Sequence, residues 1–199
     1  MVRTASDTRP TELLDAIVAY LVQHGVAELS LRPLAQAVNS SPRVLLYYFG
    51  SKEELIVKAL GRLREKQRGT FSVMREARYD RPSDSCRAIW NQMTSPQSER
   101  LFQFFFETYA LGLRHPKRFG DFLHHAVEDW IEFIAAPAIR RGQTSDQARA
   151  FATIVIAGFR GFMLDYCASH DRPRIDRAVD LWLHSLDTIP SPLPETSHA

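Results

Sequence analysis

Apolar residues recur at intervals of three and four positions along most of the chain, and no sustained stretch alternates with a period of two. The first such stretch contains Leu13, Leu14, Ile17, Val18, Leu21 and Val22. It predicts an amphipathic helix that Gly25 ends in a left-handed conformation. The same spacing predicts helices in the second half at about residues 83–95, 97–114, 117–141, 145–169 and 174–188. The pattern therefore predicts an all-α protein.

Helix-capping residues divide the next segment into two short helices. Ser30 is the predicted N-cap of the first, because a serine hydroxyl accepts a hydrogen bond from the free N–H groups of a first helical turn. Ser41 followed by Pro42 pairs an N-cap with a proline at the first helical position of the second. That helix runs to Phe49, and Gly50 ends it.

A long fourth helix follows these two. Ser51, with Glu54 three residues later, forms a capping box that opens it, and we expect the helix to fray near Gly69. The two short helices before it are joined at residues 39–41 and supported by the first helix, which predicts a tri-helical helix-turn-helix. In such a motif the second short helix lies in the major groove of DNA.

The side chains of that second short helix favour DNA binding, although the same helical spacing occurs in proteins that never bind DNA. Arg43 lies in the first turn, which reaches base edges, and an arginine there can bond a guanine bidentately. Tyr47 lies one turn further along the same face. Hydroxyl and ammonium donors at helix starts can bind phosphates. The predicted DNA-binding residues are Ser30, Arg32, Ser40, Ser41, Pro42, Arg43, Val44, Tyr47, Tyr48 and Lys52.

Residues 29–55, LSLRPLAQAVNSSPRVLLYYFGSKEEL, resemble the DNA-binding segment of the TetR family of bacterial transcriptional repressors. The pattern has a capped helix, a Leu-Ala pair, a serine that opens the next helix, an aromatic pair that ends in Phe, and a Ser-Lys that opens the long helix. The matching residues are Leu34, Ala35, Ser41, Tyr48, Phe49, Ser51 and Lys52. The motif covers roughly residues 10–65.

The segment departs from the family pattern at two positions. Many members have a glycine in the turn where this chain has Asn39, but asparagine tolerates the left-handed conformation, so we expect the turn to form. The tyrosine that usually stands three residues before the Phe is Leu46 here. Tyr47 is the alternative source of that hydroxyl, and the sequence leaves open which tyrosine contacts phosphate.

The resemblance implies a domain organisation. Residues 1–55 would form the N-terminal helix-turn-helix domain, and residues 56–199 a larger C-terminal helical domain that binds an effector and dimerises. It implies a homodimeric repressor that leaves a palindromic double-stranded operator when a small molecule binds. Neither a cofactor nor a catalytic residue is expected.

Aromatic residues are abundant in the second half, and they favour a small hydrophobic or aromatic effector. An ordinary hydrophobic core explains any single one of them equally well, since burying an aromatic ring is favourable without a ligand. As a group, the predicted ligand-binding residues are Phe102, Phe105, Phe106, Tyr109, Phe122, His125, Trp130, Phe159, Phe162, Met163 and Tyr166.

The segment at residues 145–169 is apolar on two sides. One side is marked by Phe151, Val155 and Phe162, and the other by Ile156 and Phe159. A helix of this kind must be covered twice, and a partner subunit is the simplest second cover. We therefore expect a homodimer through the last two helices, whose two recognition helices would read the half-sites of a palindrome.

Arg160 interrupts this apolar helix and needs an anion nearby, because an unpaired buried charge is costly. We expect a partner among Asp165, Glu128 and Glu132, and an acidic effector is the alternative.

Composition narrows the remaining functions. With 25 Lys and Arg against 23 Asp and Glu, a net charge of +2 excludes a polybasic coat. The two cysteines have no CxxC or Cys/His spacing, so neither a disulfide framework nor structural zinc is expected. Histidines and carboxylates at residues 124–129 have helical spacing but lack a full metal ligand set, so no metal is expected.

The chain is also expected to lack a signal peptide and a transmembrane segment, and to act in the cytoplasm without membrane contact. The alternative function is a helical carrier of hydrophobic ligands, or an enzyme, without specific DNA binding. A nucleophile–base pair or a phosphate loop would favour an enzyme, and neither is recognisable in the sequence.

Overall fold

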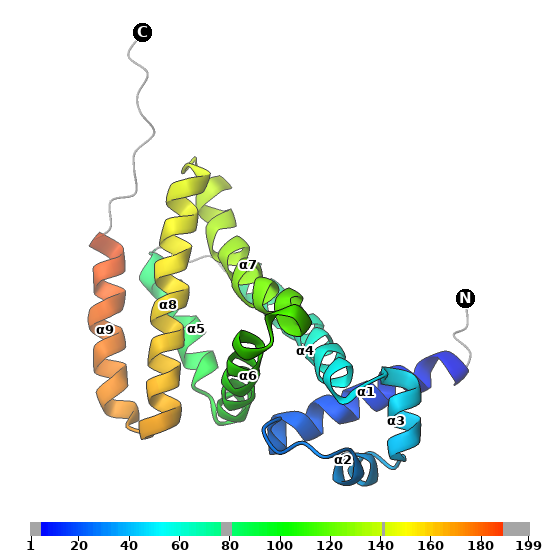
Figure 1. The fold of residues 1–199 in the computed structure, drawn as a ribbon. Coiled ribbons are helices and arrows are strands. Elements are labelled where there is room, and N and C mark those ends of the chain that lie inside the picture. Colours follow the sequence, from blue (N-terminus) through cyan, green and yellow to red (C-terminus); the bar gives the residue numbers. More distant parts are fainter. Residues whose placement is uncertain (1–4, 77–80, 141, 189–199) are drawn as a thin grey trace. The chain divides into compact units, whose positions relative to one another are not determined.

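The computed structural model describes residues 5–76, 81–140 and 142–188, and within these ranges the chain forms nine α-helices and no strand. Figure 1 labels them as α1 (Ala5–His24), α2 (Leu31–Ala37), α3 (Pro42–Phe49), α4 (Lys52–Glu76), α5 (Pro82–Met93), α6 (Pro96–Arg114), α7 (Pro116–Arg140), α8 (Ser145–Ser169) and α9 (Arg172–Thr188). The all-α prediction is confirmed, and α5 to α9 begin and end within two residues of their predicted bounds.

The residues at the ends of the first helices act largely as the sequence predicts. Gly25 follows α1 with φ of +73°, and Asn39, in the turn between α2 and α3, has φ of +50°. The left-handed turn therefore forms without a glycine, as expected for asparagine. Ser41 is the N-cap of α3, and its Oγ accepts a hydrogen bond from the Val44 N–H at 3.3 Å.

Two details of the helix ends differ from the prediction. Ser30 is the N-cap of α2, but its hydroxyl makes no capping hydrogen bond, and its carbonyl accepts the Leu34 N–H at 3.3 Å. The expected fraying near Gly69 is wrong, because α4 continues through this residue to Glu76. A glycine inside a helix costs only about 1 kcal/mol relative to alanine, which a helix of 25 residues can absorb.

The chain divides into two compact units. The first comprises residues 1–76 and 103–123, which include α1 to α4, much of α6 and the start of α7. The second comprises residues 77–102 and 124–199. The predicted functional boundary after residue 55 is a different division and stays a prediction.

A single hydrophobic core holds the first unit together. It contains Ile17, Leu21, Leu34, Leu45, Leu55, Phe104 and Phe119, none more than 1% exposed. Helices as short as α2 and α3 are unstable alone, because nucleation costs more than a few hydrogen bonds return. Burial of Leu34 and Leu45 contributes roughly 1.5–3 kcal/mol each, so packing holds both helices in place.

In the second unit, α8 packs against α5, α7 and α9. The indole ring of Trp182, on α9, lies against Gly158 so closely that any Cβ at this glycine would collide with the ring. Phe159 stands next in sequence, and its ring lies 5.2 Å from that of Trp182 and 6.5 Å from that of Trp90, between centroids. The glycine therefore allows close packing of α8 and α9 around aromatic side chains.

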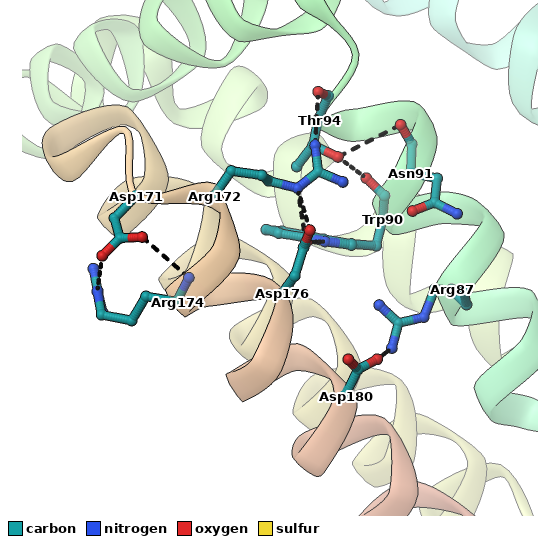
Figure 2. A network of polar contacts seen from close by, with 9 residues as sticks. All are labelled: Arg87, Trp90, Asn91, Thr94, Asp171, Arg172, Arg174, Asp176 and Asp180. Atoms are coloured by element: carbon teal, nitrogen blue, oxygen red, sulfur yellow. Dashed lines mark hydrogen bonds and ion pairs between the residues drawn. The ribbon is translucent and has the colours of Figure 1, made fainter.

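A polar network joins α5 to α9 around the fully buried Trp90 (Figure 2). Its indole Nε1 donates to the carboxylate of Asp176 at 2.7 Å. The Nε of Arg172 donates to both oxygens of the same carboxylate at 2.7 Å, and its Nη1 donates to the Thr94 carbonyl at 3.2 Å. Burial removes the indole N–H of Trp90 from water, and the network supplies the hydrogen-bond acceptor that it needs.

Candidate DNA-binding surface

Helix α3 has one buried face and one exposed face. Leu45 and Phe49, 0% and 3% exposed, anchor it in the core of the first unit. On the other side, Tyr47 is 81% exposed, Leu46 is 42% exposed, and Arg43 is also exposed. Because residues three and four apart share one face of a helix, these three side chains form one exposed surface. We call Arg43, Leu46 and Tyr47 the α3 surface.

Positive charge accompanies this surface. Arg32 is exposed in the first turn of α2, and Lys52 is the first residue of α4. Among the residues that the structure describes, neither these two nor Arg43 forms an ion pair or a side-chain hydrogen bond. Their charges are therefore available to an external anion.

The remaining predicted contacts include two serines just before α3 and two tyrosines near its end. Ser40 and Ser41 lie just before α3, and the Ser41 hydroxyl is already used to cap it. Tyr48 is half-buried and packs edge-on against Tyr47, with ring centroids 5.1 Å apart. The exposed tyrosine of α3 is therefore Tyr47, which favours it as a source of a DNA-contacting hydroxyl.

Two contacts of α4 were not predicted from the sequence, one with the end of α3 and one with α1. The Nζ of Lys58 donates to the carbonyls of Tyr48 and Phe49 at 3.4 Å each, which places a cation at the C-terminal end of α3. Arg62 donates two hydrogen bonds to the Asp15 carboxylate, at 2.8 and 3.0 Å. Hydrogen bonds from this guanidinium hold the pKa of Asp15 well below its usual value.

The predicted ligand-binding residues divide between the two units. Four lie in the first, where Phe105, Phe106, Tyr109 and Phe122 form a half-buried aromatic cluster. Ring centroids in this cluster are 5.5 to 6.5 Å apart. We call these four residues the α6–α7 aromatic cluster, since they come from α6 and the first turns of α7.

The seven other candidates lie in the second unit. Phe159 and Met163 are 4% and 0% exposed and belong to the packing of α8. The half-buried residues are Phe102, His125, Trp130, Phe162 and Tyr166. The ring of Phe162 packs against those of Trp90 and Trp182, with centroids 6.2 and 5.4 Å apart. Trp130 packs against the core that α7 and α8 share. Core packing therefore accounts for four of the seven, and a ligand role for any of them stays a prediction.

Arg160 donates a hydrogen bond to the carbonyl of Ala126, on α7. Two of the carboxylates expected beside it bind other arginines. Asp165 accepts hydrogen bonds from Arg174 at 2.7 and 2.9 Å, and Glu128 accepts one from Arg149 at 2.8 Å. The Ala126 carbonyl is thus one acceptor for Arg160, beside the carboxylates and the acidic effector that the sequence suggested.

In the part of the chain that the structure describes, few groups would support metal binding or a reactive thiol. No group of three or more His, Cys, Asp or Glu residues there could hold a metal ion. Burial raises the pKa of the Cys86 thiol to about 11, which keeps it protonated and unreactive. By length and composition alone α8 could cross a membrane, but this is weak evidence, because a core helix of a soluble protein passes the same test.

Comparison with known proteins finds a family model that matches residues 13–59 and a relative that matches most of the chain. Residues 13–59 match the model of the family described as bacterial regulatory proteins, tetR family. The chain is 25% identical over 188 residues to the HTH-type nicotine-responsive transcriptional repressor HdnoR of Paenarthrobacter nicotinovorans, which covers 91% of this chain and 97% of that one.

Solved structures share the fold. A transcriptional regulator from Rhodococcus sp. Rha1 has a TM-score of 0.76 at 18% identity and covers 93% of this chain and 99% of its own. A TetR-family regulator from Cytophaga hutchinsonii has a TM-score of 0.76 at 17% identity, with 94% and 97% covered. The match in fold thus extends over nearly the whole chain.

Proposed function

Since the chain belongs to the TetR family of bacterial transcriptional regulators, we propose that it represses transcription as a homodimer bound to a palindromic operator. We further propose that a small hydrophobic or aromatic effector releases it. The observation that carries the proposal is the α3 surface, where an arginine and two large side chains point into solvent from a helix whose other face is fixed in the core.

The α3 surface has the chemistry of a major-groove reader. Arg43 can donate two hydrogen bonds to the O6 and N7 atoms of guanine, a contact worth about 1–3 kcal/mol of discrimination. Arg32 and Lys52 would contact phosphates, which add affinity without sequence preference. With a net charge of only +2, one protomer makes few phosphate contacts, and a dimer makes twice as many.

The exposed side of α8 supports a homodimer. Ile154 and Leu164 are 46% and 54% exposed there, and Leu181 of α9 is 76% exposed. Gly161 lies on the same helix with nothing within 4 Å of where its Cβ would be, so another helix can approach closely. Exposed apolar side chains of this kind become buried when a second copy packs against them across a two-fold axis.

The α6–α7 aromatic cluster supports an apolar effector. Its four rings are half-buried, which leaves apolar surface that a small aromatic molecule can cover. The nicotine-responsive repressor of Paenarthrobacter nicotinovorans, similar over 91% of this chain, supports a small-molecule effector in general. For release, the effector must bind the DNA-incompatible state more tightly than the DNA-bound state.

Selection of bound sequences from a random pool of double-stranded DNA tests the proposal. A palindromic winner, bound with a steep salt dependence by two protomers, supports a dimeric sequence-specific regulator. A pool that stays random after repeated selection, with retained binding of hydrophobic ligands, would instead support the alternative of a ligand carrier.

A further inference from the structure

Leu46 is an apolar side chain held in solvent on the α3 surface. Its neighbour Leu45 is 0% exposed, whereas Leu46 is 42% exposed. Leucine has no hydrogen-bonding group, so it cannot bond a phosphate oxygen or a polar base edge. Its contribution to binding must come from burial against an apolar group of the partner.

The place of Leu46 relative to Arg43 limits which apolar group it can meet. Residues three apart on a helix have Cβ atoms about 5–6 Å apart. Successive base pairs of DNA are separated by about 3.4 Å along the helix axis. Leu46 therefore faces a base pair one or two steps from the one that Arg43 reads. At the major-groove edge of DNA, the apolar group is the 5-methyl group of thymine.

We propose that Leu46 is a specificity-determining residue that reads a thymine methyl group, within two base pairs of the guanine read by Arg43. The inference rests on the proposed function, since it requires α3 to lie in the major groove. It goes further because it predicts two bases of the half-site, a guanine and a nearby thymine. The thymine is recognised by its methyl group alone.

Deoxyuridine tests this directly, because it pairs as thymine does but lacks the methyl group. Each thymine of one half-site of the selected operator is replaced in turn by deoxyuridine, and affinity is measured at constant salt. For the unmodified protein, we expect one replacement to weaken binding about fourfold, which corresponds to about 0.8 kcal/mol for one buried methyl group. Replacement at the other thymines should change affinity by less than about twofold.

The Leu46→Ala variant completes the test as a cycle between protein and DNA. It should bind the thymine operator more weakly than the unmodified protein does, and it should no longer distinguish thymine from deoxyuridine at the sensitive position. Leu46→Met keeps an apolar side chain of similar volume and should keep the preference. The control is Leu113→Ala, because Leu113 is 63% exposed on α6, outside the α3 surface, and its removal should leave the preference intact.

The outcomes separate this inference from the proposed function. An operator that is bound specifically, with no thymine sensitive to loss of its methyl group, overturns the inference and leaves the proposed function standing. The same holds if Leu46→Ala retains the full preference for thymine. If no operator is selected at all, the proposed function fails and the inference fails with it.

Discussion

The carboxylate of Glu107, on α6, accepts a hydrogen bond from the backbone N–H of Val26, two residues after the end of α1, at 2.8 Å. Gly25 makes room for it, because a Cβ at this position would lie 2.5 Å from the nearer carboxylate oxygen. Glu107 stands on the same helix as Phe105 and Tyr109 of the α6–α7 aromatic cluster. A displacement of α6 would therefore strain a bond to the connection between α1 and α2.

Removing this acceptor should destabilise the first unit. Val26 is 5% exposed, so its N–H would lose its partner with little access to water, which costs about 1–3 kcal/mol. We expect Glu107→Ala to lower the free energy of unfolding by that amount in a denaturant titration. Glu107→Gln keeps an acceptor oxygen and should lose much less. Equal stability of the alanine variant and the unmodified protein would show that the bond contributes nothing.

Arg43 and Lys52 should differ in what their removal changes. Arg43→Ala should bring the affinity for operator about 10- to 100-fold closer to the affinity for random DNA, because it removes a bidentate base contact. Lys52→Ala should weaken binding to both about equally and flatten the salt dependence, as expected for a phosphate contact. Fluorescence titrations on operator and scrambled DNA at several salt concentrations measure both effects.

Arg140→Ala is the control for the Arg43→Ala variant. Arg140→Ala removes an exposed arginine at the end of α7, in the second unit, and should leave the ratio of the two affinities unchanged. An unchanged ratio after Arg43→Ala would mean that Arg43 does not read a base.

A charge among the exposed apolar side chains of α8 and α9 should dissociate the dimer. Leu181 is 76% exposed, so Leu181→Glu should leave the fold of one protomer intact and oppose burial against a partner. We expect a monomer in sedimentation experiments and loss of tight binding to a palindrome. Leu113→Glu, at a 63% exposed leucine of α6, is the matched control and should stay dimeric. If both variants sediment as the unmodified protein does, this face is not the interface.

Acid should remove one stabilising contact between α5 and α9. The hydroxyl of Ser83 donates to Asp187 at 2.7 Å and its N–H donates at 3.2 Å, and these bonds lower the pKa of the Asp187 carboxyl. A carboxyl whose pKa is lower in the folded state stabilises above its unfolded pKa, and the effect is lost as pH falls through the folded pKa.

Asp187→Asn tests this dependence. The unmodified protein should exceed this variant in free energy of unfolding at pH 6, and the difference should shrink as the pH falls below the ordinary aspartate pKa of 3.8. Denaturant titrations across that range measure the difference. A difference that is the same at pH 6 and pH 3 would show that the charge of Asp187 is not responsible.

Local sequence signals predicted most of the helices and turns. A cap such as Ser41 or a left-handed residue such as Asn39 acts within four residues, so its effect is visible in the sequence. Gly69 does not end α4, because a low helix propensity at one residue does not stop a helix that continues on both sides.

Contacts between residues far apart in the sequence were not predictable in this way. Val26 and Glu107 are 81 residues apart, and Trp90 and Asp176 are 86 apart, so no periodicity connects them. The aromatic residues pose a similar problem. Burial distinguishes Phe159, which packs in the core, from the half-buried Phe105, but both have the same apolar spacing in the sequence.

The most direct test of sequence-specific DNA binding is the affinity for the selected operator relative to a duplex of the same composition with scrambled half-sites, at one salt concentration. Specific regulators typically prefer their site by a factor of about 10³ or more. We predict a ratio of at least that size. Equal affinity for the two duplexes would contradict the claim that the protein is a sequence-specific DNA-binding repressor.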